Sequence, residues 1–489
     1  MATALGQAGR RPEQAARRLA GDSAVARSAR RSVVLAAAVA AFASCAAPPA
    51  PPDIVLVSLD NLRRDHVGLY CGGRASLTPE IDALAPEAVV FDDAWAPVPF
   101  TLPSHISMFT GLYPDVHGVD RSTARLADTL PTLPEQLKAA GYHTIGVASN
   151  LWMQGEFGFA RGFDHYEVLE YGLVYADRVN RRAFELLDAL DSDVRPLFLF
   201  LHYIDPHCDH FKAGENALPY YAPPRFLEGL GVSAGSTDFC DEADHCASEF
   251  LAAADRELRP VDRETVSRIA ALYGRGVAYV DREIGALVDG LRSRSRWDDS
   301  LVLITSDHGE EFREHGRFLH VQPYVEDLAV PLLVKLPRAR RGGARVETTV
   351  ETVDYLPTLL EAAGEPPPSH LQGKSLLPLV RGEVAPEARA AFGRDKLDRQ
   401  CFTLRLGQWT LIHHRDTGSS ELYDRLDDPT EQRDVAAQQI ERVEAMRTAL
   451  LRIVRANRKL KSTIAAEPVR GDILSDDDAE KLRAIGYVE

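Results

Sequence analysis

The stretch Asp53-Ile-Val-Leu-Val-Ser-Leu-Asp-Asn61 is an apolar run that ends in a carboxylate and an amide. The stretch Leu301-Val-Leu-Ile-Thr-Ser-Asp-His-Gly309 is built the same way and ends in a carboxylate and an imidazole. Continuous runs rich in Val and Ile are typical of strands buried on both faces of a sheet. Because the carboxyl ends of strands in an open α/β sheet converge on one crevice, we expect the two polar pairs to lie side by side.

The chain between and around these runs alternates between helix and strand patterns. Helical periodicity covers residues 132–140, 175–190 and 266–292, and apolar strand runs cover 143–148, 196–202 and 300–306. The segment Leu332-Leu-Val-Lys-Leu336, after Pro331, would extend the sheet. This alternation predicts an α/β fold with a mostly parallel central sheet flanked by helices.

Changes of composition predict the domain organisation. The α/β pattern covers residues 53–385, and residues 209–262, rich in Gly, Pro and Asp, are interpreted as an insertion near the mouth of the site. From residue 386 the pattern changes to short alternating segments followed by a helix over 440–460. We therefore expect a small C-terminal α+β subdomain over 386–460, and a tail over 461–489.

Residues 1–52 differ from the rest of the chain. Seven Arg precede the short apolar run from Val33 to Ala43, as in a secretion signal. Small residues before Cys45 and the prolines after it resemble a bacterial lipoprotein cleavage site and tether. This predicts export to the periplasm or cell envelope, with a lipid anchor on Cys45. The alternative is an ordinary signal peptide cleaved near Ala46.

Charge and cysteine usage limit the classes of function. The net charge of −16 becomes −21 without the net +5 of the first 50 residues, and this acidity argues against nucleic acid as a partner. It does not exclude an anionic substrate, because a bound cation dominates its local field. In an exported protein Cys240 and Cys246 would form a disulfide, or both would stay free thiols.

The two strand-end pairs offer ligands for a cation. Asp60, Asn61 and Asp307 supply oxygen, and His308 supplies nitrogen. An oxygen-rich site with one imidazole fits Zn²⁺ or Mn²⁺ better than Ca²⁺ or Mg²⁺. The alternative for Asp60 is that it caps the helix that follows, a common use of Asp after a strand.

Thr101 is the candidate nucleophile. It lies in a segment with three prolines that leads into a helix predicted from about Ser104. A hydroxyl at a helix N-terminus lies among free N–H groups that hold an anionic ester, and a nearby cation would activate it. A plain N-cap is the alternative for Thr101, but we expect Ser104 to cap the helix and leave Thr101 free.

Several motifs resemble the sulfatase family within the alkaline phosphatase superfamily. They are Gly111-Leu-Tyr-Pro-Asp-Val-His-Gly118, Asp205-Pro-His207, Ser306-Asp-His-Gly309, Val353-Asp-Tyr-Leu-Pro-Thr-Leu-Leu360 and Gly373-Lys-Ser-Leu-Leu-Pro-Leu379. The resemblance spans most of residues 53–455. It implies a metal site of Asp60, Thr101, Asp307 and His308, with Asn61 as a further ligand. It also implies catalytic roles for His207 and His320, and we place His105 and His202 at the substrate.

Two departures from the family pattern affect the expected chemistry. Thr101 stands where typical sulfatases have the Cys or Ser that matures to formylglycine, and His105 stands where they have Arg. No formylglycine is therefore expected, and a threonyl ester would have to be cleaved by water. We expect a metal-dependent hydrolase of sulfate or phosphate esters of a small molecule, glycan or lipid head group. The alternatives are a transferase that uses the same covalent intermediate, or a non-catalytic binding lipoprotein.

Overall fold

The computed structural model describes residues 50–475, except 73–74, 170–175, 191–193, 209–217, 221, 233–237, 240–247, 257–259, 385–386, 397–399, 465 and 472. Three buried strands form the centre of its main sheet. β1 (Ile54–Leu59) lies between β6 (Leu197–Tyr203) and β7 (Leu301–Ser306) and is parallel to both. All three are apolar runs without an exposed side chain, which confirms the strands predicted at these positions.

The sheet is mixed. Its described strands follow the order β11-β2-β10-β7-β1-β6-β4-β5, and β12 also pairs with β2. The further strands are β2 (Val89–Trp95), β4 (His143–Ala148), β5 (His165–Val168), β10 (Ala329–Lys335), β11 (Arg345–Val346) and β12 (Val350–Glu351). β10 is antiparallel to both β7 and β2, and the remaining pairs are parallel. The predicted mostly parallel α/β sheet is confirmed.

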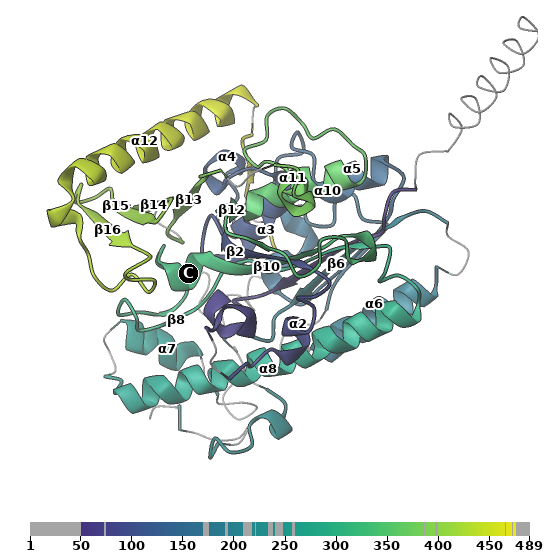
Figure 1. Cartoon of the computed structure of the whole chain (residues 1–489), viewed down its shortest axis with the longest axis horizontal. Helices are drawn as coiled ribbons and strands as arrows, with labels where there is room; N and C mark the ends of the chain where they lie inside the picture. The colour runs from purple at the N-terminus through teal and green to yellow at the C-terminus, as the bar shows by residue number, and fades with distance from the viewer. Residues whose placement is uncertain are drawn as a thin grey trace, which may run out of the picture. The chain divides into compact units, whose positions relative to one another are not determined.

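Helices cover both faces of this sheet (Figure 1). On one face lie α3 (Thr101–Thr110), α5 (Leu133–Ala139) and α10 (Tyr355–Ala362), and on the other α2 (Pro79–Asp82), α6 (Ala176–Asp188) and α8 (Arg263–Ser293). N-terminal capping residues explain where two of these helices, α5 and α8, begin. Thr132 and Glu135 form a reciprocal capping box before α5, and the Asp262 carboxylate accepts from Thr265 N at the start of α8. The helices predicted over 132–140, 175–190 and 266–292 are confirmed.

A second, antiparallel sheet forms the C-terminal part. Its strands are β13 (Ala390–Arg394), β14 (Cys401–Leu406), β15 (Trp409–His414) and β16 (Ser420–Asp424), in that order. The long helix α12 (Ile440–Thr463) packs on one face through Met446, Leu450 and Val454. This is the predicted α+β subdomain. The domain boundaries proposed from composition stay predictions.

A buried ion pair joins the two sheets. Asp93 of β2 is fully buried. Its Oδ2 accepts from Arg405 Nε of β14 at 3.0 Å, and its carboxylate forms ion pairs with Arg405 Nη2 at 2.8 Å and with Arg425 at 3.1 Å. Because Arg405 is 2% exposed, its ion pair with Asp93 is shielded from salt and holds the two sheets in one arrangement.

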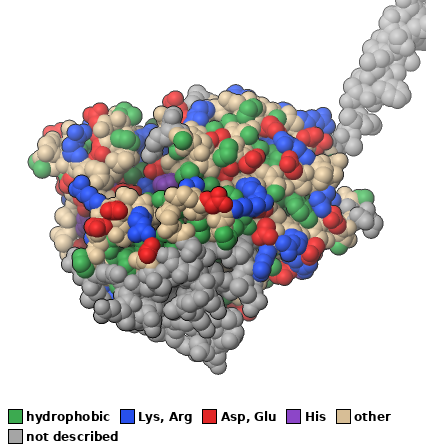
Figure 2. Space-filling model, turned by 90° about the horizontal axis from the view of Figure 1, so that it is seen from below, with side chains coloured by type: hydrophobic (Ala, Val, Ile, Leu, Met, Phe, Trp, Pro, Cys, Tyr) green, Lys and Arg blue, Asp and Glu red, His purple; other side chains and the backbone are tan. Residues whose placement is uncertain are grey.

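On the molecular surface, charges of both signs are mixed. Basic and acidic side chains are interspersed on the face drawn in Figure 2.

Some predictions fall outside the described residues. They concern the secretion signal, Cys45, the pair Cys240 and Cys246, and much of the insertion over 209–262. None of the helices in the described ranges is both long and apolar enough to span a bilayer. The signal, the anchor and the disulfide therefore stay predictions.

Candidate active site

The register of β1 and β7 brings the two polar pairs together. Leu59 pairs with Ser306, so Asp60 and Asp307 leave adjacent strands at the same level. The Asn61 backbone N–H then donates to Asp307 Oδ1 at 3.2 Å, across 246 positions of sequence. Ligand atoms of Asp60, Asp307 and His308 all lie within 4.8 Å of one another. The structure therefore brings together the predicted ligand set.

Unpartnered buried atoms indicate that this set suits a cation. Asp307 Oδ2 and Asn61 Oδ1 are buried without a hydrogen-bond partner, which is costly unless something else binds them. Asn61 has a left-handed φ of 57°, and its Nδ2 donates to Glu310, which leaves its carbonyl oxygen as the unpartnered atom. His308 Nδ1 lies 3.0 Å from the Gly309 carbonyl, so Nδ1 carries the proton and Nε2 keeps its lone pair. Three oxygens and one neutral imidazole nitrogen are ligands that a divalent cation accepts. The preference for Zn²⁺ or Mn²⁺ stays a prediction.

The two carboxylates have opposite pKa shifts. Burial raises the pKa of Asp60, but the hydrogen bond with His202 and the nearby His207 outweigh it and lower the pKa below its usual range. Burial and the charge of Asp60 hold the pKa of Asp307 well above its usual range. Two buried carboxylates so close together resist being charged at once. A divalent cation would allow both to ionise.

Thr101 is the first residue of α3 and lies beside this ligand set. Its Oγ1 is 3.3 Å from Asp60 Oδ1 and 3.5 Å from His308 Nε2. The prediction that the helix begins near Ser104 is wrong, because the N-cap residue is Phe100. Ser104 instead donates to the Asp307 carbonyl at 2.8 Å, which ties the first turn of the helix to the ligand loop.

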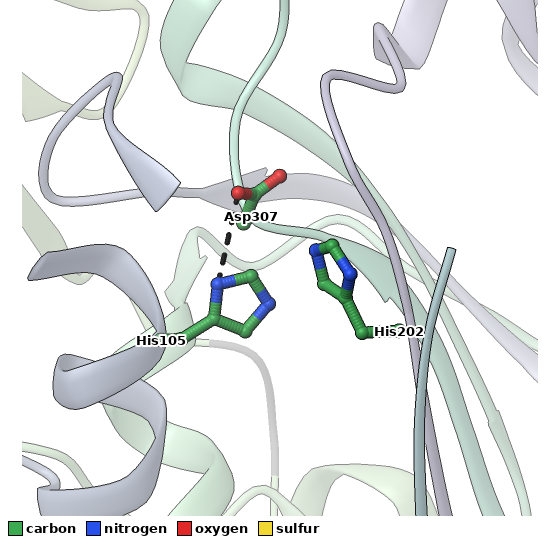
Figure 3. Close-up of side chains that lie close together, drawn as sticks. All are labelled: His105, His202 and Asp307. Atoms are coloured by element: carbon green, nitrogen blue, oxygen red, sulfur yellow. Dashed lines mark ion pairs between the residues drawn. The ribbon is translucent and has the colours of Figure 1, made fainter. Parts of the chain in front are cut away.

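His105 and His202 lie next to the ligands with fully buried side chains (Figure 3). His105 points from α3 toward Asp307, with Nδ1 3.7 Å from Asp307 Oδ2 and 2.9 Å from the Thr101 carbonyl. His202 Nε2 lies 3.3 Å from Asp60 Oδ2, and the two imidazole centroids are 5.0 Å apart. These contacts place both rings beside Thr101 and the candidate ligands Asp60 and Asp307. Their predicted binding of substrate stays a prediction.

Two further imidazoles, those of His207 and His320, lie beside His308. The His308 and His320 ring centroids are 4.5 Å apart, and those of His207 and His320 are 5.5 Å apart. Nδ1 of His320 lies 3.0 Å from the Pro99 carbonyl, and Nδ1 of His207 lies 2.7 Å from the Cys208 carbonyl. Burial lowers the pKa of both imidazoles. The predicted residues therefore converge here as neutral rings.

Two residues of the site were not predicted. Asn150 donates to Asp60 Oδ2 at 2.5 Å. Lys396 Nζ lies 3.4 Å from His320 Nδ1 and 4.9 Å from the centre of the Phe100 ring. Burial lowers the pKa of Lys396 to about 8, although Glu310 acts to raise it. Lys396 stands in a run of charged residues that is typical of a solvated loop, so no sequence signal marks it.

Comparison with known proteins identifies the family. The family model described as sulfatase matches residues 52–365, and a second one, the C-terminal region of N-sulphoglucosamine sulphohydrolase, matches residues 313–457. The chain belongs to the sulfatase family. The fold, the membership of the alkaline phosphatase superfamily and the prediction of a sulfatase-like ester hydrolase are thereby confirmed.

Individual sulfatases and related structures are similar to this chain. It is 24% identical to an N-acetylglucosamine-6-O-sulfatase of Bacteroides thetaiotaomicron, over 78% of this chain and 82% of that one, and 24% identical to a choline-sulfatase of Rhizobium meliloti, over 78% and 81%. A phosphonate monoester hydrolase of Agrobacterium radiobacter shares the fold with a TM-score of 0.63 at 20% identity, over 84% of this chain and 96% of that one. A structure in complex with its substrate D-glucosamine-2-N,6-O-disulfate has a TM-score of 0.66 at 20% identity, over 84% and 98%.

Proposed function

We propose that this sulfatase-family protein hydrolyses sulfate or phosphate esters with Thr101 as the nucleophile. The position of the Thr101 hydroxyl supports this most strongly. It lies within 3.5 Å of both Asp60 and His308, at the start of a ten-residue helix. A structural threonine would not need to face two buried groups that also suit a cation. The N-terminal end of α3 offers backbone N–H groups to the anionic part of an ester.

A divalent metal would be held by Asp60, Asn61, Asp307 and His308 beside Thr101, and when bound it would favour loss of the hydroxyl proton and offset the charge of the substrate. Asp60 Oδ1 accepts from the Thr101 hydroxyl and so orients its oxygen. The Thr101 oxygen would attack the sulfur or phosphorus while the bond from that atom to the alcohol oxygen breaks. The sulfuryl or phosphoryl group would thus transfer to Thr101, and the alcohol would leave. An attacking water would then release the anion, since threonine cannot form an aldehyde hydrate.

Three further side chains would handle the anion and the leaving oxygen. His207 and His320 hold their Nδ1 protons on backbone carbonyls, which leaves both Nε2 atoms to meet the substrate. An arriving anion raises the pKa of nearby imidazoles, so that Nε2 takes up a proton and donates to the ester. Lys396, with its pKa lowered to about 8, can protonate the leaving oxygen near neutral pH.

The test is to trap the covalent intermediate. Protein loaded with Zn²⁺ or Mn²⁺ would be mixed with matched aryl sulfate, phosphate and phosphonate esters and quenched in acid. The protein would then be digested and the masses of its peptides measured by mass spectrometry. We expect the added group on the peptide that contains Thr101. Thr101→Ala should lose the adduct and about 10⁴-fold or more in kcat, whereas Thr101→Ser should keep both in part. An adduct elsewhere, or activity of Thr101→Ala within tenfold of wild type, would overturn the mechanism.

The same assay separates the two alternatives. A transferase would pass the group to an added alcohol in preference to water, and a binding protein would retain ester without turnover. We expect turnover rather than retention of the ester, because Thr101, the candidate ligands and the imidazoles of His207 and His320 lie close together. We expect water to be the acceptor, because proteins similar to this chain are sulfatases.

We further propose that residues 1–52 direct export and that Cys45 carries a lipid anchor. The arginine-rich start, the apolar run and the proline tether support this reading of the sequence. Expression of the full chain with labelled palmitate should label the wild type and not Cys45→Ser. Equal labelling of both would contradict the anchor.

A further inference from the structure

A second constellation of reactive side chains lies on the C-terminal sheet, away from Thr101. Cys401 on β14 is directly opposite His414 on β15, and Ile412, two positions before His414, is opposite Glu421 on β16. Because alternate residues of a strand share a face, the side chains of Cys401, His414 and Glu421 follow one another across three strands. The sheet itself therefore sets their order.

Short contacts link the three groups. Cys401 Sγ lies 3.2 Å from His414 Nδ1, and His414 Nε2 lies 2.6 Å from Glu421 Oε1. The other carboxylate oxygen of Glu421 accepts from the hydroxyl of Tyr324 at 3.0 Å and from that of Tyr423 at 2.5 Å. The carboxylate is thus held in place, and it orients the imidazole toward the thiol. This is a nucleophile, a base and a group that orients the base.

The two partners of the thiol have shifted pKa values. Hydrogen bonds to Cys401 and Glu421 raise the pKa of His414 to about 10. Burial acts to raise the pKa of Glu421, but its bond to His414 and those from the two tyrosines lower it overall. Because Glu421 bonds to Nε2 and Cys401 Sγ lies beside Nδ1, the imidazole of His414 is placed to accept the thiol proton. Among the described residues, the titratable groups that face this pair are Glu421 and Tyr423 from β16 and Tyr324 from the segment before α9 (Val325–Leu328).

The thiol is also accessible to a small molecule. Cys401 is half-buried, and the side chain of His414 is 26% exposed. The other two cysteines with described surroundings are different. Cys71 Sγ lies 3.1 and 3.2 Å from the backbone carbonyl oxygens of Asp65 and Val67, which accept from the thiol, and Cys208 is 1% exposed.

We propose that Cys401, paired with His414 and Glu421, is a nucleophilic thiolate and a site of modification by low-molecular-weight disulfides. The Cys401 sulfur attacks one sulfur of the disulfide, and a new S–S bond forms as the old one breaks. The departing thiolate takes the proton from the His414 imidazolium. The products are a mixed disulfide on Cys401 and one free small thiol, with no other reactant.

The test compares Cys401 with Cys71 in one folded protein. Full-length wild type would be treated with bis(2-hydroxyethyl) disulfide between pH 5.5 and 8.5, quenched in acid, and each cysteine peptide quantified by mass spectrometry. A preformed thiolate gains about 100-fold in ionised fraction at pH 6 and loses about tenfold in intrinsic nucleophilicity. We therefore expect Cys401 to react at least about tenfold faster than Cys71 at pH 6, with a nearly flat pH profile.

Variants check the source of the reactivity. His414→Gln should lower the Cys401 rate at pH 6 by about tenfold and restore a rise with pH, and Glu421→Gln should act in the same direction. The Cys71 rate in each variant serves as the control for intact folding. A wild-type Cys401 rate less than tenfold above that of Cys71 at pH 6 would overturn the proposal, and this comparison needs no variant. An unchanged Cys401 rate in folded His414→Gln would overturn it as well.

Discussion

Replacing Gly309 with alanine should damage both stability and catalysis, although the change adds only a methyl group. Gly309 follows His308 in the ligand loop, and its N–H donates to the Asp327 carbonyl at 2.7 Å. A Cβ at this position would lie 1.8 Å from the Glu326 carbonyl oxygen and 3.3 Å from Arg63 Cγ. Since the nearest obstacle is backbone, it cannot swing aside like a flexible side chain.

Two costs give the expected magnitude. Overpacking a rigid interior costs about 1–3 kcal/mol. Moving the loop away from Glu326 also breaks the hydrogen bond of the Gly309 N–H, and a buried amide without a partner costs about 1–3 kcal/mol more. We expect the free energy of unfolding to fall by about 2–6 kcal/mol in all. Because His308 would move with the loop, a displacement of about 1 Å should lower kcat/KM by about 100-fold.

Urea unfolding and steady-state turnover of a phosphate or sulfate ester would measure the two effects. Gly274→Ala is the matched control, because its Cβ would meet only the flexible end of Leu77 at 3.2 Å inside α8. In a helix this change should be neutral or stabilise by up to about 1 kcal/mol. A Gly309→Ala protein within about 1 kcal/mol of wild type, with turnover within threefold, would refute the close approach.

Three further outcomes are expected. Asp93→Ala leaves Arg405 buried and unpaired, so it should lower the free energy of unfolding in urea by about 3–5 kcal/mol, whereas Asp128→Ala, in an exposed pair, should leave it unchanged. Burial opposes the charge on His315, but the hydrogen bond of its imidazole to the buried Glu326 raises the pKa of His315 to about 9. The charged imidazole therefore stabilises the fold fully below about pH 6.5, and this stabilisation is lost as the pH rises through 9. The difference in free energy of unfolding between wild type and His315→Asn should decrease by about 2 kcal/mol from pH 6 to 10. Removal of the metal by a chelator should abolish turnover, and Zn²⁺ at 100 times its Kd should restore it. The same Zn²⁺ concentration should raise the free energy of unfolding of wild type by about 2.7 kcal/mol, and it should not raise that of Asp307→Asn.

Much of the fold is encoded locally. The strands that precede Asp60 and Asp307 were predictable because each apolar run stops at a polar residue. The start of α5 was predictable because Thr132 and Glu135 supply both halves of a capping box. In each case neighbours in sequence carry the signal, and the ligand pairs follow from the strand ends.

The features that sequence did not predict depend on distant partners. β2 was missed because Asp92 and Asp93 interrupt its apolar pattern, and the charge of Asp93 is tolerated only beside Arg405 of the other sheet. The apolar residues of β10 do not determine the direction of the strand. The run over 332–336 therefore predicted a strand but not its antiparallel pairing with β7. Lys396 and Asn150 likewise enter the site only through the tertiary fold. Local pattern therefore places the ligands, and long-range packing supplies the groups around them.

The antiparallel direction of β10 has a consequence for how this site can change. Because β10 runs antiparallel beside β7, the segment from Asp307 to Leu328 leaves and re-enters the sheet at the same end of these two strands, the carboxyl end of β7. His308, Glu310 and His320 all belong to this one excursion, and its two ends are fixed by adjacent strands. Substitutions or length changes between these ends can reshape the substrate side of the site while the sheet and Asp60 stay as they are. The site is therefore divided between a fixed part at the end of β1 and one loop that sets the positions of His308, Glu310 and His320 together.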